Sequence, residues 1–196
     1  MITRRRFTRL ASLGAASLLL TRGRRTARGS EPPLLDPLSQ PQFVNPLPIP
    51  GVMQPAVPGG THYEVYVSQF QQHLGLHDPV SGAPLMTTVW GYNGAYPGAS
   101  FEARSNVPVT VRWLNELRDG GGDPLPHLLP VDTSVHWADP DGPGVPIVAH
   151  LHGGHTASGS DGLPDAWFTP GFQNTGRLFN EVYTYDNTQE AATLWY

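Results

Sequence analysis

The stretch VPVTVRWLN (residues 107–115) carries an apolar side chain at every second position over most of its length. Successive side chains of a strand point to opposite faces, so this period predicts a half-buried β-strand. The stretch HYEVYVSQF (62–70) repeats the pattern. The side chains predicted to face the core in these two stretches are Tyr63, Val65, Val67, Val107, Val109, Val111 and Trp113.

Five further short runs are rich in β-branched and aromatic residues and are separated by Gly, Pro, Asn and Asp. No stretch shows convincing helical periodicity. Several short strands with turns between them predict an all-β domain, either a sandwich or a barrel. The five runs are TTVWGYNG (87–94), TSVHWAD (133–139), PIVAHLHG (146–153), NEVYTYDN (180–187) and ATLWY (192–196).

The amino terminus predicts a signal peptide at residues 1–28. A basic segment precedes a short apolar run from Leu10 to Leu20, which is too short to span a bilayer as a stable helix. The residues TRRRF (3–7) resemble a twin-arginine signal, which exports folded proteins. We therefore expect a periplasmic or extracellular protein with no stable membrane insertion. A Sec-type signal or an uncleaved anchor is the alternative.

Charge is divided unevenly along the chain. Eight of the twelve basic residues lie in residues 4–28, and all sixteen acidic residues lie from Glu31 onward. Four basic against sixteen acidic residues leave the part after residue 28 with a formal charge of −12. So acidic a surface repels phosphate backbones and anionic lipid, which argues against nucleic-acid and peripheral-membrane partners. Because the sequence has no cysteine, disulfides, thiolate metal sites and thiol nucleophiles are excluded within this chain.

Residues 29–60 are rich in proline. Proline fixes φ and removes a backbone donor, so this segment is predicted to be an extended arm without regular structure. Apolar residues such as Phe43, Leu47 and Ile49 lie between the prolines, which favours an arm docked on the body of a larger protein over a solvated linker. The β-rich domain then spans residues 61–196.

The stretch AHLHGGHTASGSDG (149–162) contains three of the eight histidines. On a strand, His150 and His152 point to the same face, with Cα atoms about 6.6 Å apart. The glycines that follow allow a sharp turn and leave room beside the rings. Two imidazoles on one side suit metal ligation, either to one ion or to two neighbouring ions, although structural histidines are also common.

Two metal chemistries are open for this motif. A zinc hydrolase of the metallo-β-lactamase kind uses the ligand run His-x-His-x-Asp-His. Here Gly154 occupies the position of the aspartate, and the helices that such a fold needs are not predicted. The other chemistry is that of a copper oxidase, since imidazole ligands suit copper well.

The run HLHGGHTASGSDGLPDAWFTPG (150–171) resembles the first copper-ligand segment of the multicopper oxidases, in the branch of spore-coat-type laccases and bacterial bilirubin oxidases. The resemblance continues through nearly all of residues 43–196. It implies a cupredoxin-like fold, a Greek-key β-sandwich, as the first of three such domains. The matching stretches are LPIPGVMQP (47–55), VWGYNGAYPGASFEARSNVPVTVRWLNEL (89–117), HLLPVDTSVHWAD (127–139) and GFQNTGRLFNEVYTYDNTQEAATLWY (171–196).

The resemblance also implies roles for three residues. His150 would ligate the type 2 copper and His152 a type 3 copper of a trinuclear cluster, and Asp161 would assist proton delivery during oxygen reduction. The other ligands, and the cysteine-containing type 1 copper, would belong to the remaining cupredoxin domains. We expect the sequence to be a fragment that ends just before the next His-x-His and is not active alone.

The activity implied is a laccase-like one-electron oxidation of phenols, pigments or metal ions, coupled to reduction of O2 to water. Dioxygen and a small reducing substrate would then be the partners, besides the other domains. Two alternatives remain open: a stand-alone secreted copper-binding or carrier domain, and, less favoured by the motif, the zinc hydrolase.

Overall fold

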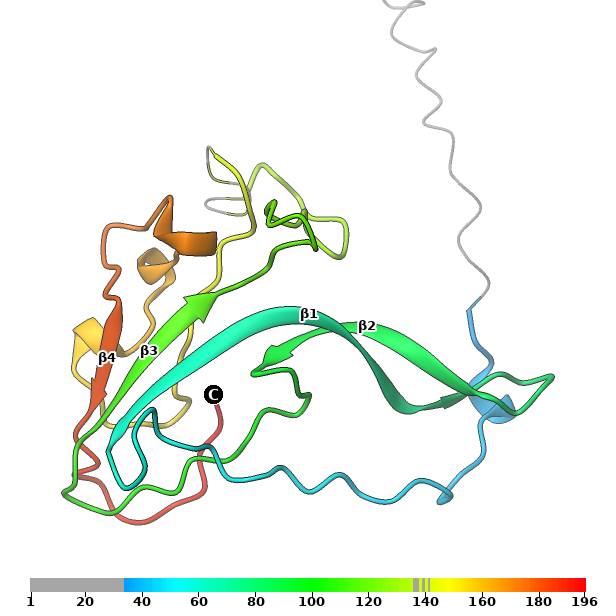
Figure 1. The fold of residues 1–196 in the computed structure, drawn as a ribbon, viewed down its shortest axis with the longest axis horizontal. Coiled ribbons are helices and arrows are strands. Elements are labelled where there is room, and N and C mark those ends of the chain that lie inside the picture. Colours follow the sequence, from blue (N-terminus) through cyan, green and yellow to red (C-terminus); the bar gives the residue numbers. More distant parts are fainter. Residues whose placement is uncertain (1–33, 136–137, 139, 141) are drawn as a thin grey trace, which may run out of the picture. The chain divides into compact units, whose positions relative to one another are not determined.

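The computed structural model describes residues 34–135, 138, 140 and 142–196 (Figure 1). The chain divides into two compact units, Met1–Gln40 and Pro41–Tyr196. In the first unit, the described residues include a short 3-10 helix, η1 (Pro37–Ser39), whose first turn is capped by the Asp36 carboxylate. The predicted signal peptide at 1–28 lies outside the described residues, and the predicted domain boundaries stay predictions.

The second unit is built on one four-stranded sheet: β1 (His62–His77), β2 (Pro84–Tyr92), β3 (Val109–Asn115) and β4 (Val182–Tyr185), in the order β2-β1-β3-β4. The central pair β1–β3 is parallel, and the two outer pairs are antiparallel. Within the described ranges there is no α-helix, which confirms the all-β class. No helix among these residues is long and apolar enough to cross a membrane.

In the described part of the second unit there are also three one-turn 3-10 helices, and all of them come after His155 in sequence. They begin at prolines or in the Ser-Gly-Ser turn rather than from any amphipathic pattern. The three are η2 (Ser158–Ser160), η3 (Pro164–Ala166) and η4 (Pro170–Phe172).

The core lies on one face of the sheet, as the period-two pattern predicts. Burial alternates strictly along β3, and the buried side is continued by β1 and by β4. The residues 93–105 and the carboxyl-terminal residues cover this face, where Tyr196 packs against Tyr92, Phe101 and Trp113. Two expectations are not met: Val107 lies before β3 begins and is 40% exposed, and Val67 is half-buried and not a member of the core cluster. The buried members on the three strands are Tyr63, Val65, Val109, Val111, Trp113, Tyr183 and Tyr185.

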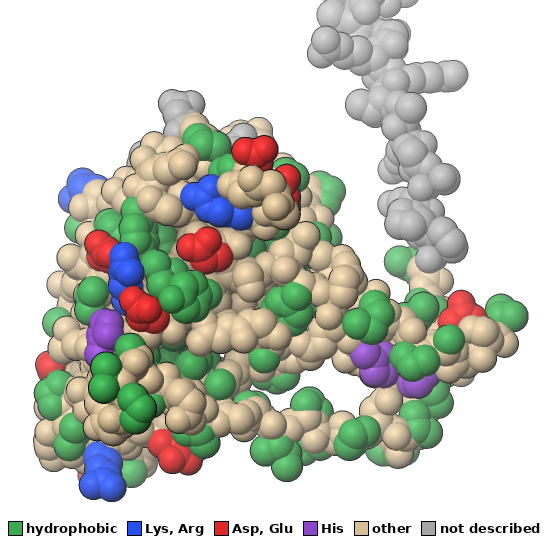
Figure 2. Space-filling model, in the orientation of Figure 1, with side chains coloured by type: hydrophobic (Ala, Val, Ile, Leu, Met, Phe, Trp, Pro, Cys, Tyr) green, Lys and Arg blue, Asp and Glu red, His purple; other side chains and the backbone are tan. Residues whose placement is uncertain are grey.

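The opposite face of β3 is polar. Arg112 pairs with Glu64 of β1 at 3.4 Å and with Glu181 next to β4 at 2.5 Å, and its guanidinium lies 5.9 Å from the Phe172 ring centre. Figure 2 shows basic and acidic side chains side by side on this part of the surface. The alternation of the sequence therefore separates a hydrophobic core from a solvated ion-pair network.

Three of the predicted strands are not strands in the structure. Residues 146–153 and 192–196 make only isolated bridges, Ile147 to Phe168 and His152 to Trp195. The reason is that residues 146–153 change partner between these two bridges, so that no ladder can build up. The described part of the third run, 133–139, forms turns.

Part of the proline-rich segment pairs with the body of the second unit. Val52 forms a parallel bridge with Ser100, and Met53 is buried in the core. In contrast, Phe43, Leu47 and Ile49 are exposed, so docking of these side chains on a larger protein stays a prediction.

A buried amide connects the sheet to the segment that carries the histidines. Asn115, at the end of β3 and 1% exposed, donates through Nδ2 to the carbonyls of Val145 (2.9 Å) and Phe168 (3.1 Å). Its Oδ1 accepts the backbone N–H of Leu117 at 3.1 Å. All three bonds are shielded from water, so Asn115 fixes where residues 145–149 leave the core.

We expect Asn115→Ala to lower the free energy of unfolding by about 2–4 kcal/mol, because it leaves buried backbone groups at Val145 and Leu117 without partners. Urea denaturation measures this loss. Asn180→Ala is the matched control, since exposed Asn180 makes one bond to the Gly159 carbonyl and its loss costs about 1 kcal/mol or less. Equal losses in the two variants would contradict the role given to Asn115.

Candidate metal centre

The histidine segment alternates between core and solvent although it is not a regular strand. Ala149 is buried and Leu151 packs against the core cluster, whereas His150 and His152 are exposed. The two imidazole rings lie on a common side, with centroids 5.9 Å apart and planes at 76°. The extended backbone, anchored through Ala149 and Leu151, is what presents the pair.

His150 is held by a backbone carbonyl. Its Nδ1 makes a hydrogen bond with the carbonyl oxygen of Asp161. A carbonyl oxygen can only accept, so the neutral ring carries its proton on Nδ1 and its lone pair on Nε2. Metal-binding histidines commonly have this arrangement, in which the second ring nitrogen donates to a carbonyl or carboxylate and fixes the ring.

The carboxylate of Asp161 lies on the same side of the ring. Its Oδ1 is 3.6 Å from His150 Nδ1 and accepts a hydrogen bond from the Thr156 hydroxyl at 2.9 Å. Burial raises the pKa of the Tyr183 phenol, and the nearby Asp161 carboxylate raises it further. The side chain is a third exposed, so it has access to water and to the imidazole.

Gly162 allows the Asp161 carbonyl to approach. Its φ of +74° is in the left-handed region, and a Cβ at this position would collide with the carbonyl oxygen of Ala149. The Asp161–Gly162 turn can therefore lie directly against the backbone of the histidine segment.

Residues near the carboxyl terminus hold the backbone of the histidine segment from His152 to His155. His152 donates its backbone N–H to the Trp195 carbonyl at 2.8 Å, and its ring lies 5.6 Å from the Trp195 ring. The Gln189 side chain accepts the backbone N–H of His155 at 2.6 Å and donates to the Gly153 carbonyl at 3.4 Å. Sequence reasoning missed both residues, because nothing local marks a residue that acts some forty positions away.

The donor set fits copper as a two-histidine portion of a site. Among the described residues, no group of three or more His, Cys, Asp or Glu side chains could hold a metal ion. An ion bound about 2.0–2.1 Å from Nε2 lies roughly 3.2 Å from the centre of that ring. Two imidazoles can therefore bind the same ion only when their ring centres are no more than roughly 6.4 Å apart. The ring centres of His150 and His152 are 5.9 Å apart, which is near this limit. Binding of one shared ion and binding of two neighbouring ions are therefore both compatible with this distance.

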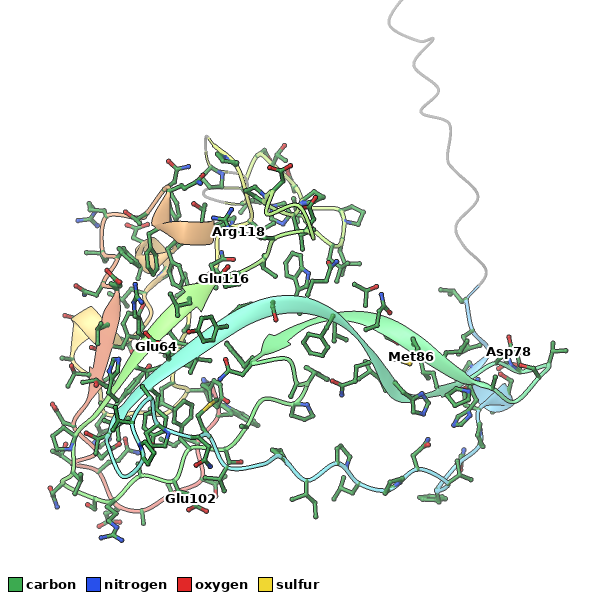
Figure 3. The ribbon with its side chains drawn as sticks, viewed as in Figure 1. Glu64, Asp78, Met86, Glu102, Glu116 and Arg118 are labelled. Atoms are coloured by element: carbon green, nitrogen blue, oxygen red, sulfur yellow. The ribbon has the colours of Figure 1, made fainter. Side chains whose placement is uncertain are left out.

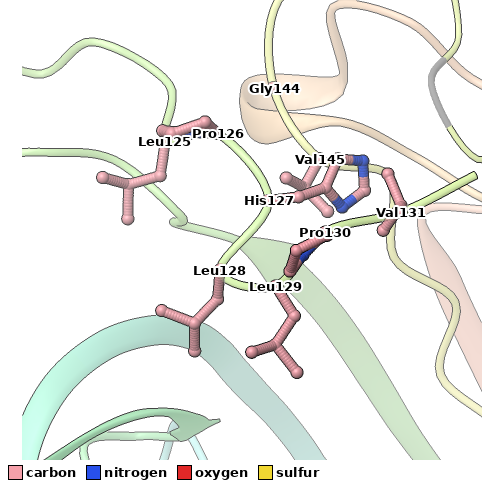
Figure 4. Close-up of a pocket in the computed structure, with 9 residues that line it drawn as sticks. All are labelled: Leu125, Pro126, His127, Leu128, Leu129, Pro130, Val131, Gly144 and Val145. Atoms are coloured by element: carbon pink, nitrogen blue, oxygen red, sulfur yellow. The ribbon is translucent and has the colours of Figure 1, made fainter. Parts of the chain in front are cut away.

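His127 and His62 lie on other segments of the described chain. His127 contacts the Ala138 carbonyl at 2.8 Å and lines a mostly apolar hollow of about 560 Å³ (Figure 4). His62 contacts the Thr110 hydroxyl at 2.9 Å. The hollow has no charged side chain along its wall, so we assign it no chemistry.

Known proteins similar to this chain are oxidases. It is 43% identical over 158 residues to a laccase of Bacillus stratosphericus and 41% identical over 160 residues to a laccase of Bacillus subtilis. Each match covers 79% of this chain and 29% of the laccase, so the chain spans less than a third of these relatives. No family model matches the sequence.

A solved multicopper oxidase structure has a similar fold. The multicopper oxidase of Pediococcus acidilactici superposes with a TM-score of 0.50 at 22% identity, covering 86% of this chain and 27% of that one. The chain belongs to the multicopper oxidase family, a family of oxidoreductases, and corresponds to a part of those enzymes.

We expect Gly162→Ala to weaken copper(II) binding by about tenfold to a hundredfold, because the added methyl group displaces the Asp161 carbonyl from His150. Competition titration against a chelator measures the affinity. Gly59→Ala is the control: Gly59 has a similar φ of +77° but open space around it, so the same backbone strain arises far from the histidines. Equal affinities in the two variants would show that the carbonyl contact is not needed.

Proposed function

We propose that this chain is the first cupredoxin domain of a laccase-like multicopper oxidase and supplies His150 and His152 to its copper cluster. The observation that carries the proposal is the contact of His150 Nδ1 with the Asp161 carbonyl, which leaves Nε2 as the metal-binding nitrogen beside a second imidazole. The all-β fold and the similarity to laccases support it.

In this proposal His150 ligates the type 2 copper and His152 one of the type 3 coppers. Copper, when bound, supplies the one-electron redox chemistry that links substrate oxidation to the reduction of O2. The chain's own part is to fix the two rings. The carbonyl of Asp161 fixes the proton of His150, and the Trp195 backbone fixes the segment at His152.

Asp161 is proposed to deliver protons near the cluster. Its carboxylate is part-exposed, lies 3.6 Å from the His150 ring and is oriented by Thr156. A carboxylate that touches water on one side and the ligand shell on the other can take up a proton and pass it inward.

The remaining parts of the proposed enzyme lie outside this chain. Other cupredoxin domains supply the missing histidines and the type 1 copper, which needs a cysteine thiolate. Electrons come from a small reducing substrate such as a phenol, a pigment or a metal ion, and O2 accepts them. The arginine-rich segment before residue 28 supports export, by the twin-arginine route.

The test is a titration of the full chain with copper(II), followed by spectroscopy and oxygen uptake. We expect weak binding with imidazole-nitrogen coupling in the electron paramagnetic resonance spectrum, no intense blue band, and loss of that coupling in His150→Ala/His152→Ala. His62→Ala, at an exposed histidine elsewhere, should change nothing. Unchanged coupling in the double variant would refute the ligand assignment.

The same preparation tests whether the chain alone has oxidase activity. With a phenolic substrate and excess copper, we expect no turnover at ordinary enzyme rates, above about 1 s⁻¹. Such turnover would contradict the proposal that the chain is one part of the centre. Tight binding of one copper ion by the chain alone would instead favour a copper-carrier domain.

A further inference from the structure

The imidazole of His152 is held differently from that of His150. Nδ1 of His150 bonds to the Asp161 carbonyl, whereas among the described residues neither ring nitrogen of His152 makes a hydrogen bond. The rings beside His152 are those of His150, at 5.9 Å between centroids, and of Trp195, at 5.6 Å with the planes inclined at 42°. Within the described chain, the ring of His152 is therefore held by packing and not by a hydrogen bond.

Trp195 contributes little to the hydrophobic core. Its side chain is 71% exposed, whereas the next residue, Tyr196, packs against the aromatic side chains of the core. A large ring that stays this exposed gains little free energy from burial. The contact with the imidazole of His152 is thus the interaction that the position of the indole ring provides.

The backbone directs the indole ring to this place. The Tyr196 hydroxyl donates to the Ala99 carbonyl at 2.5 Å, on the segment 93–105 in which Figure 3 labels Glu102. This bond and the core packing of Tyr196 fix the residue that follows Trp195. His152 donates its backbone N–H to the Trp195 carbonyl at 2.8 Å, in an antiparallel bridge. Residues directly opposite each other in such a bridge have their side chains on the same side, so the two rings meet.

We infer, on the basis of the proposed function, that Trp195 is a positioning residue for the copper ligand His152. The indole ring restricts rotation of the imidazole and keeps it on the side that it shares with His150. A side chain that is held before the ion arrives loses less conformational entropy when it binds. The indole nitrogen is only a hydrogen-bond donor, so Trp195 acts through His152 and does not bind the ion itself.

Copper(II) titration of the full chain, read by affinity and by electron paramagnetic resonance, tests the inference. Trp195→Leu removes the ring but keeps the backbone bond to His152, whereas Trp195→Phe keeps an aromatic ring. We expect Trp195→Leu to weaken binding about tenfold and to reduce the coupling from two imidazole nitrogens to one, as His152→Ala does. Trp195→Phe should restore most of both. Parent affinity and coupling in Trp195→Leu would overturn the inference.

A double-mutant comparison tests whether the indole acts through His152. In a His152→Ala background, Trp195→Leu should cause no further loss of affinity, because the ring that it positions is already gone. Trp90→Leu is the matched control: it removes a half-buried indole from β2 and should leave copper affinity unchanged. A further tenfold loss in the His152→Ala background, or an equal loss in Trp90→Leu, would overturn the inference.

A metal-free measurement separates the positioning role from the ligand assignment. In proton NMR spectra of the copper-free chain, the ring current of the indole should displace the ring-proton resonances of His152, and Trp195→Leu should abolish this displacement. Resonances that Trp195→Leu leaves in place would overturn the positioning role, even where copper binds. If the displacement is present but copper coupling is unchanged in His150→Ala/His152→Ala, the ligand assignment of the proposed function is refuted, and the inference with it.

Discussion

The hydrogen bond between His150 Nδ1 and the Asp161 carbonyl is the contact on which the candidate metal centre depends. It selects the tautomer, fixes the ring plane and leaves Nε2 directed away from its own backbone. It exists only because Gly162 adopts a left-handed conformation and has no Cβ to meet the Ala149 carbonyl. The function proposed for His150 is therefore determined by a turn that lies eleven residues further along the chain.

The sheet contributes by holding this turn and the histidine segment in one place. Ala149 is part of the core cluster, and buried Asn115 connects the end of β3 to the backbone at Val145 and Phe168. On the other side, Trp195 pairs with His152. The two imidazoles are thus carried on an irregular segment that is fixed at both ends, which suits ligands that must keep their geometry.

Much of the fold follows from the sequence. The period-two pattern predicted β1 and β3, β-rich composition predicted β2 and β4, and His150 and His152 were predicted on a common side. The pairing of strands could not be predicted in the same way. Residues 146–153 have the composition of a strand but change pairing partner after Ile147, and composition does not encode that change. The contributions of Gln189 and Trp195 depend on contacts distant in sequence. The backbone role of Asp161 was missed because sequence reasoning considers side chains, whereas it is the carbonyl that holds His150.

The central claim is that His150 is prepared for metal through its Nε2, and its tautomer is the most direct test. Long-range proton–nitrogen correlation NMR of the metal-free full chain, labelled with ¹⁵N-histidine and assigned with a His150→Gln variant, reports which ring nitrogen is protonated in the neutral form. The account predicts a protonated Nδ1 and a bare Nε2 for His150, with Gly162→Ala shifting the ring toward a mixture of tautomers. A proton on Nε2 in the parent chain would contradict it.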